Sequence, residues 1–176
     1  TPCSFSLLSF KDIMKVGGGG LINSITIAGT VAVVTAAVSK HGVEALAGYG
    51  LGSRLEIIIT PLVFGIGSVL TASVGINVGA QQLPRAKMIA WTGAFISFCV
   101  VGLLGATVTI FPDIWLNNFE SSTLIRDYAT SYLIIVAPFY CFFAVGQTLY
   151  FASQGLGKIF YPVIVGVIRL LSVSII

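Results

Sequence analysis

The sequence predicts an all-α protein, a polytopic bundle of membrane-spanning helices. Of its 176 residues, 56% are hydrophobic and only 9% are charged, whereas a soluble domain carries about 25% charged residues. Nine Lys and Arg and six Asp and Glu are too few to cover so apolar a core in water. We therefore expect the lipid bilayer to be the solvent and main partner of the chain.

The positions of the charges predict where the helices cross the membrane. Uncharged stretches run from Lys15 to Lys40, from Glu56 to Arg85, from Lys87 to Asp113 and from Asp127 to Lys158. Each holds at least the roughly 20 apolar residues that a helix needs to cross about 30 Å of hydrocarbon. The strict alternation expected of barrel strands is missing, and only helices otherwise satisfy their backbone polar groups in lipid.

Five spans follow in order, at about residues 21–39, 57–78, 89–111, 128–153 and 160–176. The fifth runs into the end of the chain, so we expect it to be truncated and residues 1–176 to be an internal piece of a larger membrane protein. We expect loops between the spans, including a glycine-rich one over residues 41–55. Lys and Arg are more frequent in the N-terminal segment and the second and fourth loops, which places the N-terminal end in the cytoplasm and the protein in the cell membrane.

Small residues predict where the spans pack, since helices in lipid associate through close contacts. Small side chains recur every four residues in the first two spans and just before the second. These stripes are Ser24, Ala28, Ala32 and Ala36; Ser68 and Ala72; Gly75 and Gly79; and Gly48 and Gly52.

Polar residues inside the spans predict where function lies, because each must find a partner or face a watery cavity. Asn23, Thr26 and Thr30 share one face of the first span, and Tyr140, Gln147 and Gln154 share one face of the fourth. Pro138 precedes that second row and is expected to bend the helix. We interpret Asn23, Thr30, Tyr140 and Gln147 as candidates for a substrate cavity. The alternative is that they form hydrogen bonds that only hold the bundle together.

Three further residue sets have a predicted role. Arg169 lies about nine residues, or about 13 Å, into the fifth span. A charge at this depth costs about 2.5 to 3.5 kcal/mol. The arginine therefore needs a partner, which would be a helix carbonyl, a watery cavity or an acidic residue outside residues 1–176. Arg54 and Glu56 are interpreted as a surface ion pair in preference to a proton relay. Tyr132 and Tyr150 are interpreted as interfacial anchors, with a cavity role as the alternative.

The residues predict no catalytic site and no metal site. His41 is the lone histidine and the three cysteines lack metal-ligand spacing. The basic residues are dispersed, so we expect no nucleic-acid partner and no enzyme.

Several motifs resemble the multidrug and toxic compound extrusion (MATE) transporters. Residues 48–56 read GYGLGSRLE and residues 74–80 read VGINVGA, followed by Arg85-Ala86, where the family shows G-x-R-x-E, V-G-Q-N-x-G-A and R-A. Ile76 departs from the family's Gln. Further matches are Pro138-Phe139-Tyr140, Gly146-Gln147, residues 154–157, Pro162 and Arg169.

The resemblance implies a secondary antiporter of two six-helix lobes that exports drugs or other organic compounds, with a cationic solute expected, in exchange for sodium ions or protons. The chain would be the C-terminal lobe into its fifth helix, partnered by an N-terminal lobe. No resident cofactor is expected. Because no acid lies inside a predicted span, coupling would fall to the other lobe.

Two alternatives remain open from the sequence. One is a flippase for lipid-linked oligosaccharides of the same superfamily, which would need a more cationic cavity than Arg169 alone provides. The other is a membrane scaffold without transport activity, against which the polar row beside Pro138 argues.

Overall fold

Helices form the regular structure of the computed structural model, which describes residues 7–119, 121–157 and 160–175. In order they are α1 (Leu7–Ser39), α2 (Val43–Ser53), α3 (Glu56–Gly79), α4 (Leu83–Ile110), α5 (Pro112–Leu116), α6 (Thr123–Val136), the 3-10 helix η1 (Ala137–Phe139), α7 (Tyr140–Gly155) and α8 (Phe160–Ser174). No strand occurs within these ranges. The predicted all-α class is confirmed.

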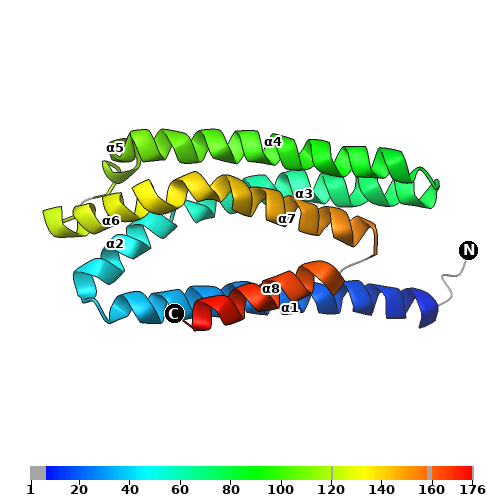
Figure 1. Ribbon diagram of the computed structural model, residues 1–176, viewed down its shortest axis with the longest axis horizontal. Coiled ribbons are helices and arrows are strands. Elements are labelled where there is room, and N and C mark those ends of the chain that lie inside the picture. Colours follow the sequence, from blue (N-terminus) through cyan, green and yellow to red (C-terminus); the bar gives the residue numbers. More distant parts are fainter. Residues whose placement is uncertain (1–6, 120, 158–159, 176) are drawn as a thin grey trace, which may run out of the picture.

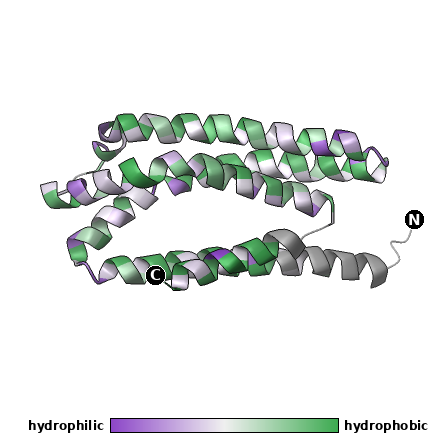
Figure 2. Ribbon diagram, in the orientation of Figure 1, coloured by the Kyte–Doolittle hydropathy of each residue, from purple (hydrophilic) through white to green (hydrophobic). Residues whose placement is uncertain are grey.

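Four apolar segments of the described chain are long enough to cross a bilayer, at Gly20–Ser39, Val43–Gly79, Leu83–Ile110 and Thr123–Gly155. A shorter apolar helix follows at Val163–Ser174. Figure 2 shows the long helices coloured mainly hydrophobic, with strongly hydrophilic residues gathered mainly near helix ends. The chain is therefore a multi-pass membrane protein built as a helix bundle.

The helices form two groups that α2 connects (Figure 1). In one group α7 packs on α3 and α4, and α6 packs on α2. In the other, α8 lies along α1. Figure 1 shows the α1–α8 pair set apart from α7, with α2 running from one group to the other.

The helix bounds differ from the predicted spans at several places: α4 begins at Leu83 instead of residue 89, α6 begins at Thr123 instead of residue 128, and α5 forms within a predicted loop. Helix α1 begins at Leu7, so the glycine run before the first span continues the helix. Residues 43–53, predicted as a loop, form α2. A helix satisfies its own backbone hydrogen bonds, which an apolar segment in lipid requires even when it is rich in glycine.

Glycines decide how closely α2 and α7 approach their neighbours. A Cβ atom added at Gly48 would lie 2.5 Å from Cβ of Tyr128, and one added at Gly155 would lie 2.5 Å from the backbone oxygen of Thr71. Gly52 is similarly closed off by the ring of Tyr132. The glycine stripe before the second span is thus a packing stripe, as predicted.

Of the other predicted stripe residues, Gly75 packs on α7, where an added Cβ would lie 3.6 Å from the backbone oxygen of Gly155. Ser24, Ala28, Ala32 and Ala36 are all exposed on α1, and Ser68, Ala72 and Gly79 are exposed on α3. The buried glycine of α3 is Gly67, one residue before the predicted stripe, against the ring of Phe151. One residue turns a helix by about 100°, so a one-residue error moves the contact to another face.

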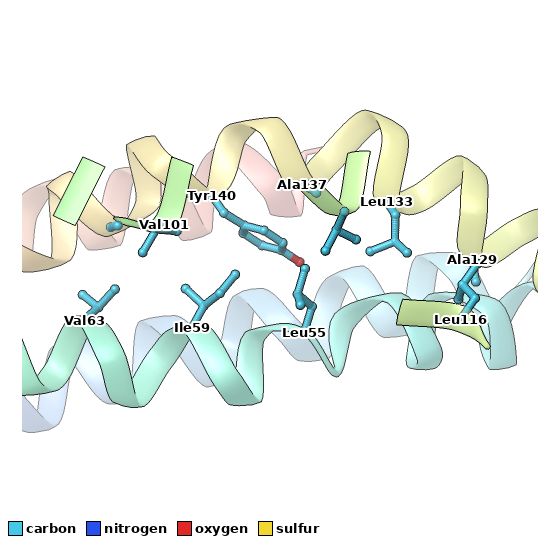
Figure 3. Close-up of a cluster of buried hydrophobic side chains, with 11 residues drawn as sticks. Leu55, Ile59, Val63, Val101, Leu116, Ala129, Leu133, Ala137 and Tyr140 are labelled. Atoms are coloured by element: carbon cyan, nitrogen blue, oxygen red, sulfur yellow. The ribbon is translucent and has the colours of Figure 1, made fainter. Parts of the chain in front are cut away.

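The main core lies where α3, α4 and α6 meet η1 and α7 (Figure 3). Ile59, Val63, Val101 and Leu133 at its centre are fully buried. Figure 3 shows the side chain of Tyr140 extending from its helix toward Leu55 and Ile59. One polar residue thereby crosses an otherwise apolar interface.

The break in the fourth span falls at the proline, as predicted. Ala137, Pro138 and Phe139 form η1 between α6 and α7. A proline removes a backbone donor and its ring clashes with the preceding turn, which favours a break of the α-helix here. The break lets α6 pack on α2 while α7 packs on α3 and α4.

Candidate functional site

A carboxylate inside the bundle is hydrogen-bonded by two tyrosines. The hydroxyl of Tyr140 donates to Oε1 of Glu56 at 3.2 Å, and that of Tyr132 donates to the same oxygen at 3.4 Å. The two hydroxyl oxygens are 3.2 Å apart. We call Glu56, Tyr132 and Tyr140 the carboxylate cluster. It joins the first turn of α3 to both sides of the break at η1.

The predicted ion pair between Arg54 and Glu56 is wrong. Glu56 is only partly exposed and bonds the tyrosines, whereas the guanidinium of Arg54 lies 5.5 Å from the centre of the Phe119 ring. The ion pair that the described residues form is Arg126 with Asp113. Side chains two residues apart on a helical segment point to different sides, so Arg54 and Glu56 separate.

The expectation that no acid lies inside a span is also corrected. Glu56 falls within the continuous apolar segment Val43–Gly79. The sequence prediction began the span at residue 57 because the charge itself marked the boundary. The R-x-E motif was the available signal, since side chains at i and i+2 point to different sides of a helix and need not share one environment.

The carboxylate cluster borders a cavity of about 840 Å³ between α1, α2 and α3. Glu56, Tyr49 and Thr35 contribute polar atoms to its lining, and Val31 and Leu46 contribute apolar surface. The ring of Tyr49 meets that of Tyr132 edge to face, with the ring centres 5.4 Å apart. Glu56 is therefore placed to exchange a small cation or a proton with a cavity.

A second cavity of about 460 Å³ lies between α1, α7 and α8. Its lining includes Asn23 from α1, Gln147 from α7 and Arg169 from α8. These three were predicted from the sequence, and the structure brings them together. We call this the arginine cavity.

Thr30 and Tyr140 lie outside the arginine cavity. The hydroxyl of Thr30 donates to the backbone oxygen of Thr26 at 2.8 Å, which satisfies it within its own helix. Tyr140 belongs to the carboxylate cluster. The four predicted cavity residues are thus divided: Asn23 and Gln147 line the arginine cavity, Tyr140 joins the carboxylate cluster, and Thr30 lies in neither. Helical spacing had grouped Asn23 with Thr30 and Tyr140 with Gln147, and the structure separates both pairs.

Tyr132 and Tyr150 were interpreted first as interfacial anchors, with a cavity role as the alternative; Tyr150 takes that cavity role, and Tyr132 lines neither cavity. Tyr132 joins the carboxylate cluster, and Tyr150 lines the arginine cavity. The hydroxyl of Tyr150 and atoms Nε and Nη2 of Arg169 are buried without a hydrogen-bond partner among the described residues. Buried polar groups are rarely left unpaired.

The family model for MatE matches residues 21–176 of this chain. The chain belongs to the MatE family. That assignment agrees with the glycine-rich R-x-E motif, which runs from α2 into the first residue of α3, and with the VGINVGA motif at the end of α3.

Two curated relatives are similar to this chain over most of its length. A protein named FAD transporter from Shewanella oneidensis is 28% identical over 141 residues, which are 78% of this chain and 31% of the relative. A protein named probable multidrug resistance protein NorM from Thermotoga maritima is 25% identical over 157 residues, which are 89% of this chain and 34% of the relative. The chain spans about a third of the length of these MatE relatives.

Proposed function

We propose that this chain forms most of one lobe of a secondary transporter, which exchanges an organic solute for a sodium ion or a proton across the cell membrane. The observation that carries the proposal is the carboxylate cluster. A carboxylate within a membrane span is costly unless it is paired, protonated or hydrated, and such residues mark ion and proton pathways. Membership of the MatE family and the names of both relatives support an organic solute as the other partner in exchange.

In this proposal Glu56 takes up and releases the coupling cation. The tyrosine hydroxyls stabilise the free carboxylate by donating to it, and a bound sodium ion or proton neutralises the charge. Because the cluster links α3 to helices on either side of η1, a change in its charge alters contacts that hold α6 and α7. Charge state thereby biases the relative populations of two arrangements of the bundle.

The test uses the complete transporter in proteoliposomes. We expect Glu56→Gln to abolish accumulation of a solute driven by a sodium or proton gradient, and to leave solute binding in the absence of a gradient within about threefold. Gradient-driven flux of the solute and its equilibrium binding measure the two effects. Imposing the sodium and proton gradients separately identifies the coupling ion.

Glu44→Gln is the matched control, since Glu44 is an exposed acid on the neighbouring helix α2. It should retain driven flux. If Glu56→Gln accumulates solute as well as the unchanged protein does, Glu56 is not the coupling residue.

The proposed orientation places the N-terminal end of α1 in the cytoplasm. Figure 1 shows the turn between α3 and α4 at the same end of the bundle as the beginning of α1. Arg85 and Lys87 follow that turn, and Lys and Arg in short loops favour the cytoplasmic side. Labelling of a cysteine introduced at exposed position 87 from inside, and not from outside, would support this orientation.

A further inference from the structure

The arginine cavity contains a positive charge and apolar walls that have no part in the proposed coupling function. We propose that it binds an aromatic organic anion, with the guanidinium of Arg169 on a carboxylate or phosphate group of the solute. This inference rests on the proposed transport function and names its substrate class. It differs from the cationic solute expected from the sequence, and the two make opposite predictions.

The charge of Arg169 is the first observation that supports an anionic ligand. Arg169 projects from an apolar helix, and no Asp or Glu is among the residues that line the cavity. Its Nε and Nη2 atoms have no acceptor in the described part of the chain. Nε and Nη2 belong to the planar fork with which arginine binds both oxygens of a carboxylate or phosphate. An anion is therefore the partner that this group lacks.

Polar groups around the arginine complement the same ligand. The buried hydroxyl of Tyr150 has no partner among the described residues and lines the same cavity. Side-chain amides of Asn23 and Gln147 also line it, and amide nitrogens donate hydrogen bonds. The groups come from three helices, so the cavity exists only when α1, α7 and α8 are assembled.

The remaining walls are apolar and suit an aromatic body. Phe142, Phe143, Leu149 and Val165 contribute to the lining. A volume of about 460 Å³ falls within the range of about 300–1,000 Å³ typical of small-molecule pockets. At Gly146 an added Cβ would meet no atom within 4 Å, so this wall is open. A small planar anion fits this combination better than the two chains of a phospholipid.

The experiment measures binding to the complete transporter in detergent by isothermal titration calorimetry, with four probes that share a naphthalene ring. They are 2-naphthoate, 2-naphthyl phosphate, the neutral 2-naphthamide and (naphthalen-2-ylmethyl)trimethylammonium. We expect at least one of the two anions to bind more than tenfold more tightly than the amide, and the ammonium compound to bind most weakly. Tightest binding of the ammonium compound, or equal binding of anions and amide, would overturn the proposal.

Variants connect that preference to the cavity. Arg169→Gln should lower affinity for the preferred anion by roughly ten- to a hundredfold, the range of a charged hydrogen-bonding group, and leave the amide within about threefold. Arg169→Lys should recover part of the anion preference. Gly146→Leu, which keeps the arginine and fills the open wall, should weaken anion and amide alike.

Three outcomes contradict the proposal. Unchanged anion affinity in Arg169→Gln would show that the arginine pairs with a protein carboxylate elsewhere in the transporter. If phosphatidylglycerol binds to the transporter through Arg169 and neither naphthalene anion binds, the partner of the arginine is a lipid headgroup. If Arg169→Gln does not fold, as judged by gel filtration, an unchanged anion-to-amide ratio in Arg169→Lys together with unchanged affinities in Gly146→Leu would contradict it.

The binding measurement is independent of the coupling test. No ion gradient is present, and Glu56→Gln should retain the anion preference because Glu56 does not line the arginine cavity. Failure of Glu56 as a coupling residue and failure of the anion site therefore give different results.

Discussion

Gly48 and Gly50 lie two residues apart on α2 and have opposite surroundings. Gly48 contacts the backbone and Cβ atoms of α6, whereas a Cβ atom added at Gly50 would meet no atom within 4 Å. The neighbours of Gly48 include backbone atoms of α6, and backbone atoms move only if the two helices separate. A glycine in a helix is thus either a requirement of packing or a local weakness, and its neighbours decide which.

We expect Gly48→Ala to destabilise the protein by roughly 1–3 kcal/mol, since overpacking displaces well-packed neighbours. Gly50→Ala, its matched control, should be neutral or stabilising by up to about 1 kcal/mol, because alanine favours helix more than glycine does. Unfolding of the purified transporter in mixed micelles, followed by circular dichroism, measures both. Equal effects of the two substitutions would contradict the close packing of α2 on α6.

A buried hydroxyl pair offers a second residue-scale comparison. The hydroxyl of Thr148 on α7 donates to Oγ of Ser97 on α4 at 2.8 Å, and both residues are fully buried. Thr148→Val should lower the free energy of unfolding by roughly 0.6–1.7 kcal/mol, the range of interhelical hydrogen bonds in membranes. The same unfolding assay measures it.

Thr107→Val is the control for that pair. Thr107 is exposed and bonds the backbone oxygen of Leu103 within its own helix. Its removal should change stability by less than about 0.5 kcal/mol. A comparable loss from both variants would show that the hydroxyl pair adds nothing to the association of α4 and α7.

At the scale of an element, the break at Pro138 separates two packing directions within one span. Helix α6 contacts α2, and α7 contacts α3 and α4. Tyr132 precedes the break and Tyr140 follows it, and both bond Glu56. The geometry of η1 therefore determines whether both hydroxyls reach the carboxylate.

We expect Pro138→Ala to slow gradient-driven transport at least fivefold and to leave solute binding unchanged, because an uninterrupted helix holds one arrangement in preference to the other. Flux in proteoliposomes and equilibrium binding separate the two quantities. Pro84→Ala is the control, since Pro84 lies exposed in the first turn of α4, where a proline disturbs no helical hydrogen bond. Transport at the original rate in Pro138→Ala would remove the break from the mechanism.

At the scale of the molecule, the two helix groups define the arginine cavity between them. Its polar residues come from α1 and α8 on one side and from α7 on the other. Relative movement of the groups would open or close it. This arrangement suits a solute site whose access changes during transport.

A cysteine at position 147 tests access to that cavity, in the complete transporter with its native cysteines replaced by serine or alanine. An aqueous thiol reagent should label it, and a saturating concentration of the preferred naphthalene anion should slow labelling severalfold. A cysteine at position 97 is the control, because Ser97 is fully buried between helices, and it should stay unlabelled. Protection of position 147 in all conditions would favour a scaffold without a solute cavity.

The sequence by itself determined the features that depend on local composition and on one helix at a time. Long uncharged stretches predicted the spans, Pro138 predicted the break, and polar residues inside the spans marked candidate sites. Asn23, Gln147 and Arg169 were found in this way because charged and amide groups in lipid are conspicuous wherever they lie.

Only the tertiary structure decided which faces meet. It joined Glu56 to Tyr132 and Tyr140 across separate spans, left the small-residue stripe of α1 exposed, and made α2 a helix packed on α6. The physical reason is that period and hydropathy describe a helix about its own axis. The rotation of one helix against another depends on contacts between distant residues, and in lipid those contacts are set by close packing and hydrogen bonding instead of hydrophobicity.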